Sequence, residues 1–192
     1  FTNSIGIGNS SVAYFGHQVE AGDFASSYIP TSGSIKTRSA DVCNNGGNEQ
    51  VFNDSEGVLY TEMSALSNDT TNRRITISDN TLDNRVVLGF ADTSNAILAL
   101  VGSSGTQFVA TPTISDVTSN NKFALKYKQN DFALWINGVE VATDTSGNTP
   151  VGLSTLNIHG STGFGIFHGN LKYVRVYNTA LTDSELQALT TI

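Results

Sequence analysis

The sequence predicts an all-β protein, an antiparallel two-sheet jelly-roll β-sandwich with a short C-terminal helix. The first observation is the strand-like run 132–136, followed by Asn137-Gly138, a pair that allows the positive φ angles of a tight type I′ hairpin. The second is composition, because 18 glycines and only three prolines among many Ser, Thr and Asn residues suit short strands joined by polar turns. The third is Thr182, which stands three residues before Glu185 and predicts a capped helix near the end.

About ten strands are expected, each an apolar or β-branched run between turn residues. In order, they cover residues 58–64, 74–78, 85–90, 96–101, 106–110, 123–128, 132–136, 139–143, 155–159 and 171–177. Their spacing is typical of sandwiches and jelly rolls. The helix should begin at Thr182, because Leu181 and Leu186 occupy the two positions of a hydrophobic staple around that cap.

The first forty residues have a different texture. A strand is expected over 11–20, and glycines and Pro30 interrupt the stretch that follows it. We interpret residues 1–38 as an N-terminal strand and extended arm, or the remnant of an upstream module, and residues 39–192 as the sandwich. Such an arm can add a strand to the sheet of a neighbouring subunit, so a homo-oligomer formed through the arm is one expectation.

Charge and composition exclude several classes of function. The formal net charge is −7, and no run of Lys or Arg forms a stripe that could follow a phosphate backbone, so nucleic acid is not expected as a partner. No apolar run approaches the roughly 20 residues that a membrane-spanning helix needs. Cys43 is the single cysteine, so an intrachain disulfide cannot form and core packing must stabilise the fold.

Two stretches carry a resemblance to a known family. Residues 130–145, which begin Asn130-Asp-Phe-Ala-Leu-Trp-Ile-Asn-Gly, and residues 169–186 resemble concanavalin A-like, laminin-G-like lectin domains. Residues 16–31, together with 37–41, look like the segment that precedes such domains in tailed-phage fibre and spike proteins. The resemblance implies a jelly roll on the virion surface, with other virion proteins and a cell-surface or extracellular polysaccharide as partners.

Catalytic motifs of comparable sandwiches are missing, so we expect no catalytic residues and no enzyme. The resemblance to sandwich glucanases would imply Glu-x-Asp-x-x-Glu on one strand, and that pattern is absent. The Arg-rich and Gln-x-His strands of jelly-roll alginate lyases are also missing, although Tyr127-Lys128 is present. The expected function is therefore a non-catalytic phage virion surface domain with a carbohydrate-binding or structural role. A polysaccharide-degrading lyase or glucanase, or an accessory carbohydrate-binding module of one, stays open as the alternative.

Four residues are candidates for glycan binding. If the apolar residues on either side of it face the core, Trp135 points to the opposite face, where an exposed indole could stack on a sugar ring. Tyr127, Arg85 and Arg175 could line that same face. The alternative is that the N-terminal arm or another subunit covers the face and buries the indole.

Oxygen ligands on loops raise the question of a metal. Asp92, Asn95, Asp144 and Asn148 supply the hard donors that calcium prefers, but such residues also form turns without a metal. We therefore leave structural calcium open, without assigning ligands, and expect no other cofactor.

Overall fold

The computed structural model describes residues 19, 28–30, 32–36 and 46–192. The chain divides into two units, Phe1–Asp41 and Val42–Ile192, and every element described below belongs to the second. The boundary expected near Arg38 and the single cysteine lie outside the described residues, as does the strand expected over 11–20 except for Val19. The arm over residues 1–38 therefore stays a prediction.

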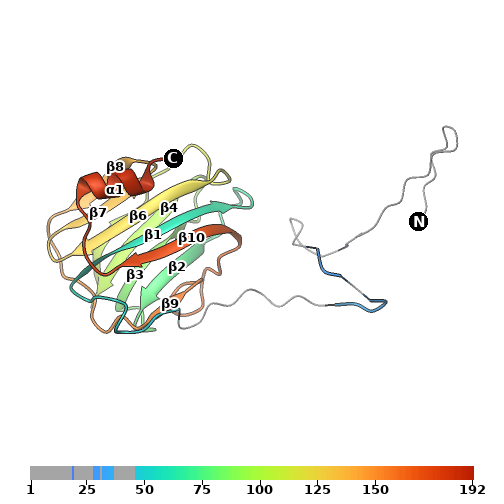
Figure 1. The fold of residues 1–192 in the computed structure, drawn as a ribbon, viewed down its shortest axis with the longest axis horizontal. Coiled ribbons are helices and arrows are strands. Elements are labelled where there is room, and N and C mark those ends of the chain that lie inside the picture. Colours follow the sequence, from blue (N-terminus) through green and yellow to red (C-terminus); the bar gives the residue numbers. More distant parts are fainter. Residues whose placement is uncertain (1–18, 20–27, 31, 37–45) are drawn as a thin grey trace. The chain divides into compact units, whose positions relative to one another are not determined.

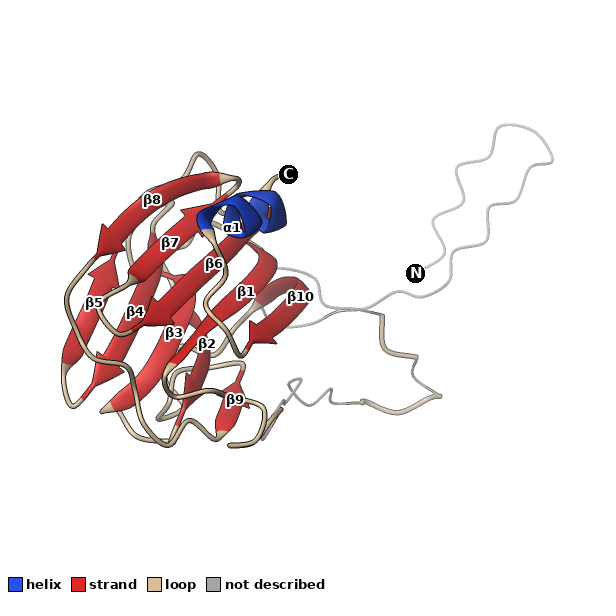
Figure 2. Ribbon diagram, turned by 60° about the vertical axis from the view of Figure 1, so that its left-hand side comes forward, coloured by secondary structure: helices blue, strands red, loops and turns tan. Residues whose placement is uncertain are grey.

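Ten strands within the described residues form two five-stranded antiparallel sheets (Figures 1 and 2). Sheet A has the order β10 (Gly169–Tyr177), β1 (Glu56–Ala65), β6 (Asn121–Lys128), β7 (Phe132–Ile136), β8 (Val139–Asp144). Sheet B has the order β5 (Thr106–Ala110), β4 (Ile97–Ser103), β3 (Asn84–Phe90), β2 (Arg73–Ser78), β9 (Thr155–Asn157). The predicted all-β sandwich is confirmed, and each expected strand from residue 58 onward is present.

Side chains from both sheets fill one apolar core. Inward and outward positions alternate along each strand, as in β6, where Phe123, Leu125 and Tyr127 point inward and are fully buried. Phe90 of β3 meets Phe123 edge to face across the two sheets, with ring centroids 6.3 Å apart. Burying one such side chain stabilises a fold by about 1.5–3 kcal/mol, so this core is the main source of stability.

The hairpin between β7 and β8 has the predicted geometry. Asn137 and Gly138 have φ angles of 50° and 82°, as a type I′ turn requires. The Asn137 side chain accepts a hydrogen bond from the Lys122 backbone N–H at 2.9 Å and donates one to Asn121 Oδ1 at 2.8 Å. The Gly138 N–H donates to Thr190 Oγ1 at 3.1 Å. The turn is therefore tied both to the neighbouring strand and to the C-terminal segment.

The helix begins where the capping pattern predicted. In α1 (Asp183–Thr190), Thr182 Oγ1 accepts from the Glu185 N–H at 3.4 Å, and the Glu185 carboxylate accepts from the Thr182 N–H at 2.8 Å. The two staple residues, Leu181 and Leu186, lie in one apolar cluster. None of the helices in the described part of the chain is long and apolar enough to cross a membrane.

Helix α1 covers the outer face of sheet A, above β6 and β7 (Figure 2). Leu186 is its fully buried apolar residue, and it lies in one cluster with Val58, Tyr60, Ala124, Ala133 and Trp135. Lys126 Nζ lies 2.7 Å from Asp131 Oδ1 and 3.7 Å from Asp183 Oδ1, which adds a polar link between the sheet and the helix. No helix of the described residues covers sheet B, so the two outer faces of the sandwich differ.

An ion pair at the start of β2 makes stability depend on pH. Asp69 accepts hydrogen bonds from Arg73 Nη2 at 2.6 Å, Ser67 Oγ at 2.8 Å and the Thr71 N–H at 3.0 Å. The Arg73 bond is the largest cause that holds the pKa of this carboxyl well below its usual range, and burial opposes it only in part. A carboxyl with a depressed pKa contributes stability that is complete above its unfolded pKa, near 4, and is lost as pH falls.

The free energy of unfolding should therefore stay level above about pH 5 and decline below about pH 4. Asp69→Asn should lower it at pH 7, because Arg73 is buried and would lose its charge partner. The same variant should lose less on going from pH 7 to pH 3 than the wild type does. Urea titrations of both proteins at the two pH values measure this, and an equal decline in both would contradict the assignment.

Candidate functional site

Trp135 points to the outer face of sheet A, as the alternation predicted, because Leu134 and Ile136 lie in the core. Its indole is only 7% exposed, since Leu186 and the rest of α1 pack over it. The indole is buried, as the alternative expected, and among the described residues its cover is the C-terminal helix. The indole therefore offers a sugar no open ring face in this structure.

Tyr127 faces the other way, into the core. It is fully buried, and its hydroxyl donates a hydrogen bond to the Asn53 carbonyl oxygen at 2.8 Å. Burial, and to a smaller extent the charge of Asp54, raises the pKa of this phenol, so it stays protonated and donating. Its role in the structure is to anchor the segment that leads into β1.

The two arginine candidates lie on different sheets. Arg175 is on β10 opposite Tyr60, on the outer face of sheet A, with its guanidinium carbon 5.2 Å from the centroid of the Tyr173 ring. Arg85 is on β3, which pairs with β2 and β4 in sheet B. The structure therefore does not bring Trp135, Tyr127, Arg85 and Arg175 onto one face, and their assignment as glycan ligands stays a prediction.

The loop residues considered for calcium form no single set either. Asn95 lies just before the start of β4, where its Oδ1 accepts from the Val117 N–H at 3.1 Å. Asn148 lies beyond the other end of that strand, where its N–H donates to Gln107 Oε1 at 3.0 Å. Asp144 forms a turn with Ser146. Within the described residues no group of three or more His, Cys, Asp or Glu side chains is arranged to hold a metal ion, and calcium stays an open prediction.

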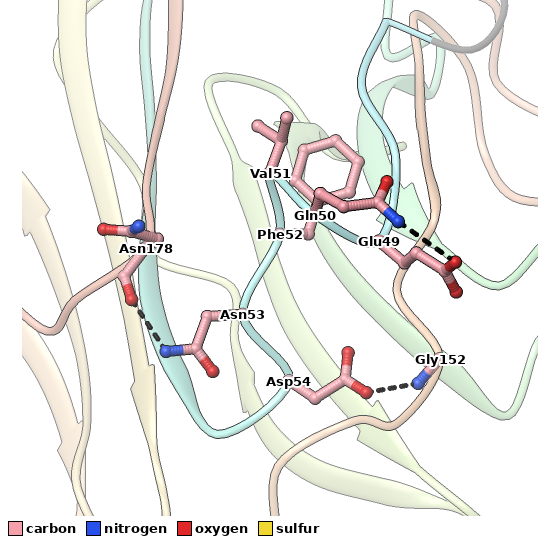
Figure 3. A pocket seen from close by; sticks show the side chains of 8 residues that line it. All are labelled: Glu49, Gln50, Val51, Phe52, Asn53, Asp54, Gly152 and Asn178. Atoms are coloured by element: carbon pink, nitrogen blue, oxygen red, sulfur yellow. Dashed lines mark hydrogen bonds between the residues drawn. The ribbon is translucent and has the colours of Figure 1, made fainter.

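One pocket of about 360 Å³ lies beside the segment that leads into β1 (Figure 3). Its polar groups bond mainly to each other. Asp54 accepts from the Gly152 and Leu153 N–H groups at 2.6 and 2.9 Å, and Asn53 Nδ2 donates to the Asn178 carbonyl at 2.8 Å. These bonds tie three distant segments together, so we assign the pocket a structural role. It is lined by Glu49, Gln50, Val51, Phe52, Asn53, Asp54, Gly152 and Asn178.

The outer face of sheet B carries a cluster of polar side chains. It consists of Arg74, Thr76 and Arg85 on the strands and Ser161 in a nearby turn, and we call it the arginine face. Arg74 and Thr76 alternate with core residues of β2, so they point away from the core, as Arg85 does on β3. On this outer face, Thr76 lies opposite Val87. The Arg74–Gly89 pair is the next outward pair in one direction along the strands, and the Ser78–Arg85 pair is the next in the other direction. Ser161 lies in the turn that follows β9.

Four buried atoms of the arginine face have no hydrogen-bond partner among the described residues. They are Nε of Arg74, Nε of Arg85, Oγ1 of Thr76 and Oγ of Ser161. Thr76 is fully buried and Ser161 is 8% exposed. Buried polar groups in folded proteins are nearly always hydrogen-bonded, so four unpartnered groups on one face require an explanation. Arg74 and Arg85 themselves are only half-buried, so part of each arginine remains accessible at this face.

The turn after β9 positions Arg74. The Arg74 backbone N–H donates to the Gly165 carbonyl at 2.9 Å, and the Arg74 guanidinium carbon lies 5.0 Å from the centroid of the Phe164 ring. A Cβ at Gly160 would lie 2.6 Å from the Phe164 carbonyl oxygen, so this glycine allows the turn to close beside the arginine. Phe164 itself is 57% exposed and presents an apolar surface next to the guanidinium.

Sequence alternation alone indicates that Arg74 and Arg85 point outward, but it could not show that they share a face. That requires the pairing of β2 with β3. Ser161 and Phe164 carried no signal, because they lie in a turn whose path over β2 depends on the short strand β9. Of the four candidates from the sequence, only Arg85 belongs to this cluster.

Comparisons with known proteins agree with this architecture. Residues 64–187 match a laminin G-type family model described as the concanavalin A-like lectin/glucanases superfamily. No curated protein sequence matches the chain. Among solved structures, the sialidase module CBM40 of Ruminococcus gnavus bound to α2,3-sialyllactose is similar, with a TM-score of 0.61, 18% identity, and coverage of 73% of this chain and 85% of the module.

Two further structures show how widely the architecture occurs. The NanB sialidase of Streptococcus pneumoniae has a TM-score of 0.60 and 13% identity, over 73% of this chain and 24% of the sialidase. A heptameric SAP-like pentraxin of Limulus polyphemus has a TM-score of 0.58 and 11% identity, over 75% of this chain and 72% of the pentraxin. At these identities the structural likeness concerns the fold. With the family model matching more than half of its residues, the chain belongs to the concanavalin A-like lectin/glucanases superfamily.

Proposed function

We propose that this chain is a non-catalytic carbohydrate-binding protein whose ligand occupies the arginine face. The observation that carries the proposal is the set of four buried, unpartnered polar atoms on the outer side of β2, β3 and the turn after β9. Two of these atoms belong to Arg74 and Arg85, which are only half-buried and carry further guanidinium N–H donors for a ligand at this face. A sugar suits the face because its hydroxyl groups both donate and accept hydrogen bonds.

The neighbouring side chains favour a sugar for a second reason. Phe164 is exposed beside Arg74, and Leu100 of β4 lies half-buried opposite Val87. Carbohydrate rings have apolar C–H surfaces that pack on aromatic and aliphatic side chains, while their rims form hydrogen bonds. The similar modules of Ruminococcus gnavus are described as bound to α2,3- and α2,6-sialyllactose, which supports carbohydrate binding as a use of this architecture.

The arginine face lacks the carboxyl groups that hydrolysis of a glycan would need. Glycoside hydrolysis normally needs two carboxyl groups beside the scissile bond, and the outward positions of β2, β3 and β4 carry none. Glu62 of β1 is buried on the other sheet, where its Oε1 accepts hydrogen bonds from Lys172 Nζ at 2.7 Å and Asn120 Nδ2 at 2.6 Å. The Lys172 bond is the largest cause that lowers the pKa of Glu62, whereas a general acid needs a raised pKa.

The proposal extends to location. The likeness of residues 16–31 and 37–41 to the segment that precedes such domains in tailed-phage fibre and spike proteins supports a place on the virion surface, in contact with other virion proteins. A homo-oligomer formed through residues 1–38 belongs to the same proposal. Peptides of this chain should then be found in purified phage particles by mass spectrometry, and particles without them would contradict the location.

Carbohydrate binding can be tested on the full chain with arrays of bacterial and algal polysaccharides. We expect micromolar to millimolar affinity for at least one glycan and no release of reducing sugar from it. Phe164→Ala should weaken that binding, because its exposed ring lies beside the Arg74 guanidinium and can pack on a sugar. Tyr173→Ala is the matched control, since Tyr173 is also an exposed aromatic residue beside an arginine but lies on sheet A, and this variant should bind normally. Arrays without any bound glycan would contradict the proposal.

A further inference from the structure

We infer that Arg74 and Arg85 bind the carboxylate of an acidic sugar, so that the ligand of the arginine face is an acidic rather than a neutral glycan. The inference rests on the proposed carbohydrate-binding function and names the class of glycan.

First, neither guanidinium is paired with a carboxylate of the residues that the structure describes. The adjacent Arg73 shows the ordinary arrangement, with Nη2 2.6 Å from Asp69 Oδ2. For Arg74, the hydrogen bond that the structure gives is to a neutral amide, Asn72 Oδ1, at 3.3 Å, and Arg85 makes no side-chain hydrogen bond within the described residues. Partly buried arginines are usually paired with an anion, so this pair is incomplete without one.

The second step is that the two charges act on each other. Burial is the largest cause that lowers the pKa of the Arg74 guanidinium, the charge of Arg85 is the next, and the exposed carboxylate of Asp92 opposes them only weakly. Two cations on a partly buried surface repel one another, and an anion placed between them removes that repulsion. The guanidinium forks also match the two oxygens of a carboxylate.

The third step concerns space and fixed geometry. Gly89 lies opposite Arg74 on β3, and Gly102 lies opposite Arg85 on β4, so each arginine has a cross-strand neighbour without a side chain. A Cβ at Gly102 would lie 3.4 Å from Arg85 Cγ, and one at Gly165 would lie 3.1 Å from Arg74 Cγ. The stem of each arginine therefore lies over a glycine, in space that a larger side chain would take.

Fourth, the surroundings of the two arginines suit an acidic sugar better than a densely charged polyanion. The chain as a whole has a net charge of −7, which disfavours a long, densely charged ligand. The arginine face is a small positive area that also contains hydroxyl groups and the exposed Phe164 ring. A glycan with one carboxylate per sugar, surrounded by hydroxyl and C–H groups, fits this mixture of chemistry.

The experiment compares matched ligands on the full chain. Oligosaccharides that contain glucuronic, galacturonic, mannuronic or nonulosonic acids are titrated by calorimetry beside the same oligosaccharides with their carboxyls reduced to alcohols. We expect binding to at least one acidic member, and at least a tenfold higher Kd after reduction. Equal affinity before and after reduction would overturn the inference, and so would tighter binding of matched sulfated oligosaccharides.

Variants connect the effect to the two residues. Arg74→Gln and Arg85→Gln keep hydrogen-bonding side chains but remove the charge, and each should raise the Kd for the acidic glycan at least tenfold. Lys128→Gln removes one positive charge from an exposed position on sheet A and should leave the Kd unchanged. An equal rise in all three variants would overturn the inference. If arrays show only neutral glycans, the inference fails and the proposed function stands; if they show none, both fail.

Discussion

Replacing Leu186 with alanine is expected to lower the free energy of unfolding by about 2–5 kcal/mol and to expose Trp135 to water. Leu186 is the fully buried apolar residue of α1, and it packs with Val58, Tyr60 and Trp135 on the outer face of sheet A. The helix has eight residues, and a helix this short is not stable in water without tertiary packing. Losing this contact therefore weakens the packing of the whole helix, in addition to leaving a cavity where the leucine side chain was.

The chain carries its own probe for this result, because Trp135 is its single tryptophan. The fluorescence emission of folded Leu186→Ala should shift to longer wavelength than that of the wild type, and denaturant titration should give the loss of stability. Gln187→Ala, at an exposed position of the same helix, is the control and should change stability by no more than about 0.5 kcal/mol. A folded Leu186→Ala with unchanged emission would show that α1 does not cover the indole.

Gly89→Ala should be the most damaging single change in sheet B, with a loss of about 3 kcal/mol or more. The added Cβ would overlap the Arg73 carbonyl oxygen and would lie 2.9 Å from Arg74 Cα. All the obstructing atoms are backbone of the paired strand β2, so a change of rotamer cannot relieve the contact. Strands β2 and β3 would have to move apart.

Gly102→Ala is the matched control for this prediction. Gly102 also points outward, on the adjacent strand β4, but its Cβ would lie 3.2 Å from the nearest atom, the Asp83 carbonyl oxygen. A shift of a few tenths of an ångström would accommodate it, so the loss should be much smaller. Thermal unfolding of both variants checks the difference, and equal melting temperatures would show that β2 and β3 are not held as closely as described.

Local sequence patterns were sufficient to predict the strands and the helix of the sandwich, but not to predict which residues form the arginine face. The run 132–136 with Asn137-Gly138 predicted the β7–β8 hairpin, and the pattern around Thr182 predicted where α1 begins, because each depends on residues near each other in sequence. The order of strands depends instead on pairings between distant segments, such as β1 with β10. No local signal contains that information.

The same distinction explains the fate of the individual site residues. Alternation gave the correct direction for Trp135, but its cover depends on a helix that lies far along the chain. The assignment of Arg85 to a face shared with Arg175 required a strand order that the structure does not have. Arg74 became a candidate only when β2 was seen to pair with β3.

The β7–β8 turn has a consequence for the chemical lifetime of the protein. Asn-Gly pairs are the sequences most prone to deamidation, which begins when the glycine nitrogen attacks the asparagine side-chain carbonyl and ammonia leaves. Here that nitrogen donates its hydrogen to Thr190 of α1, and the Asn137 amide is held on both sides by neighbouring groups of β6. The helix thereby protects the turn against ageing, and a chain that loses its last residues would begin to acquire isoaspartate at this hairpin.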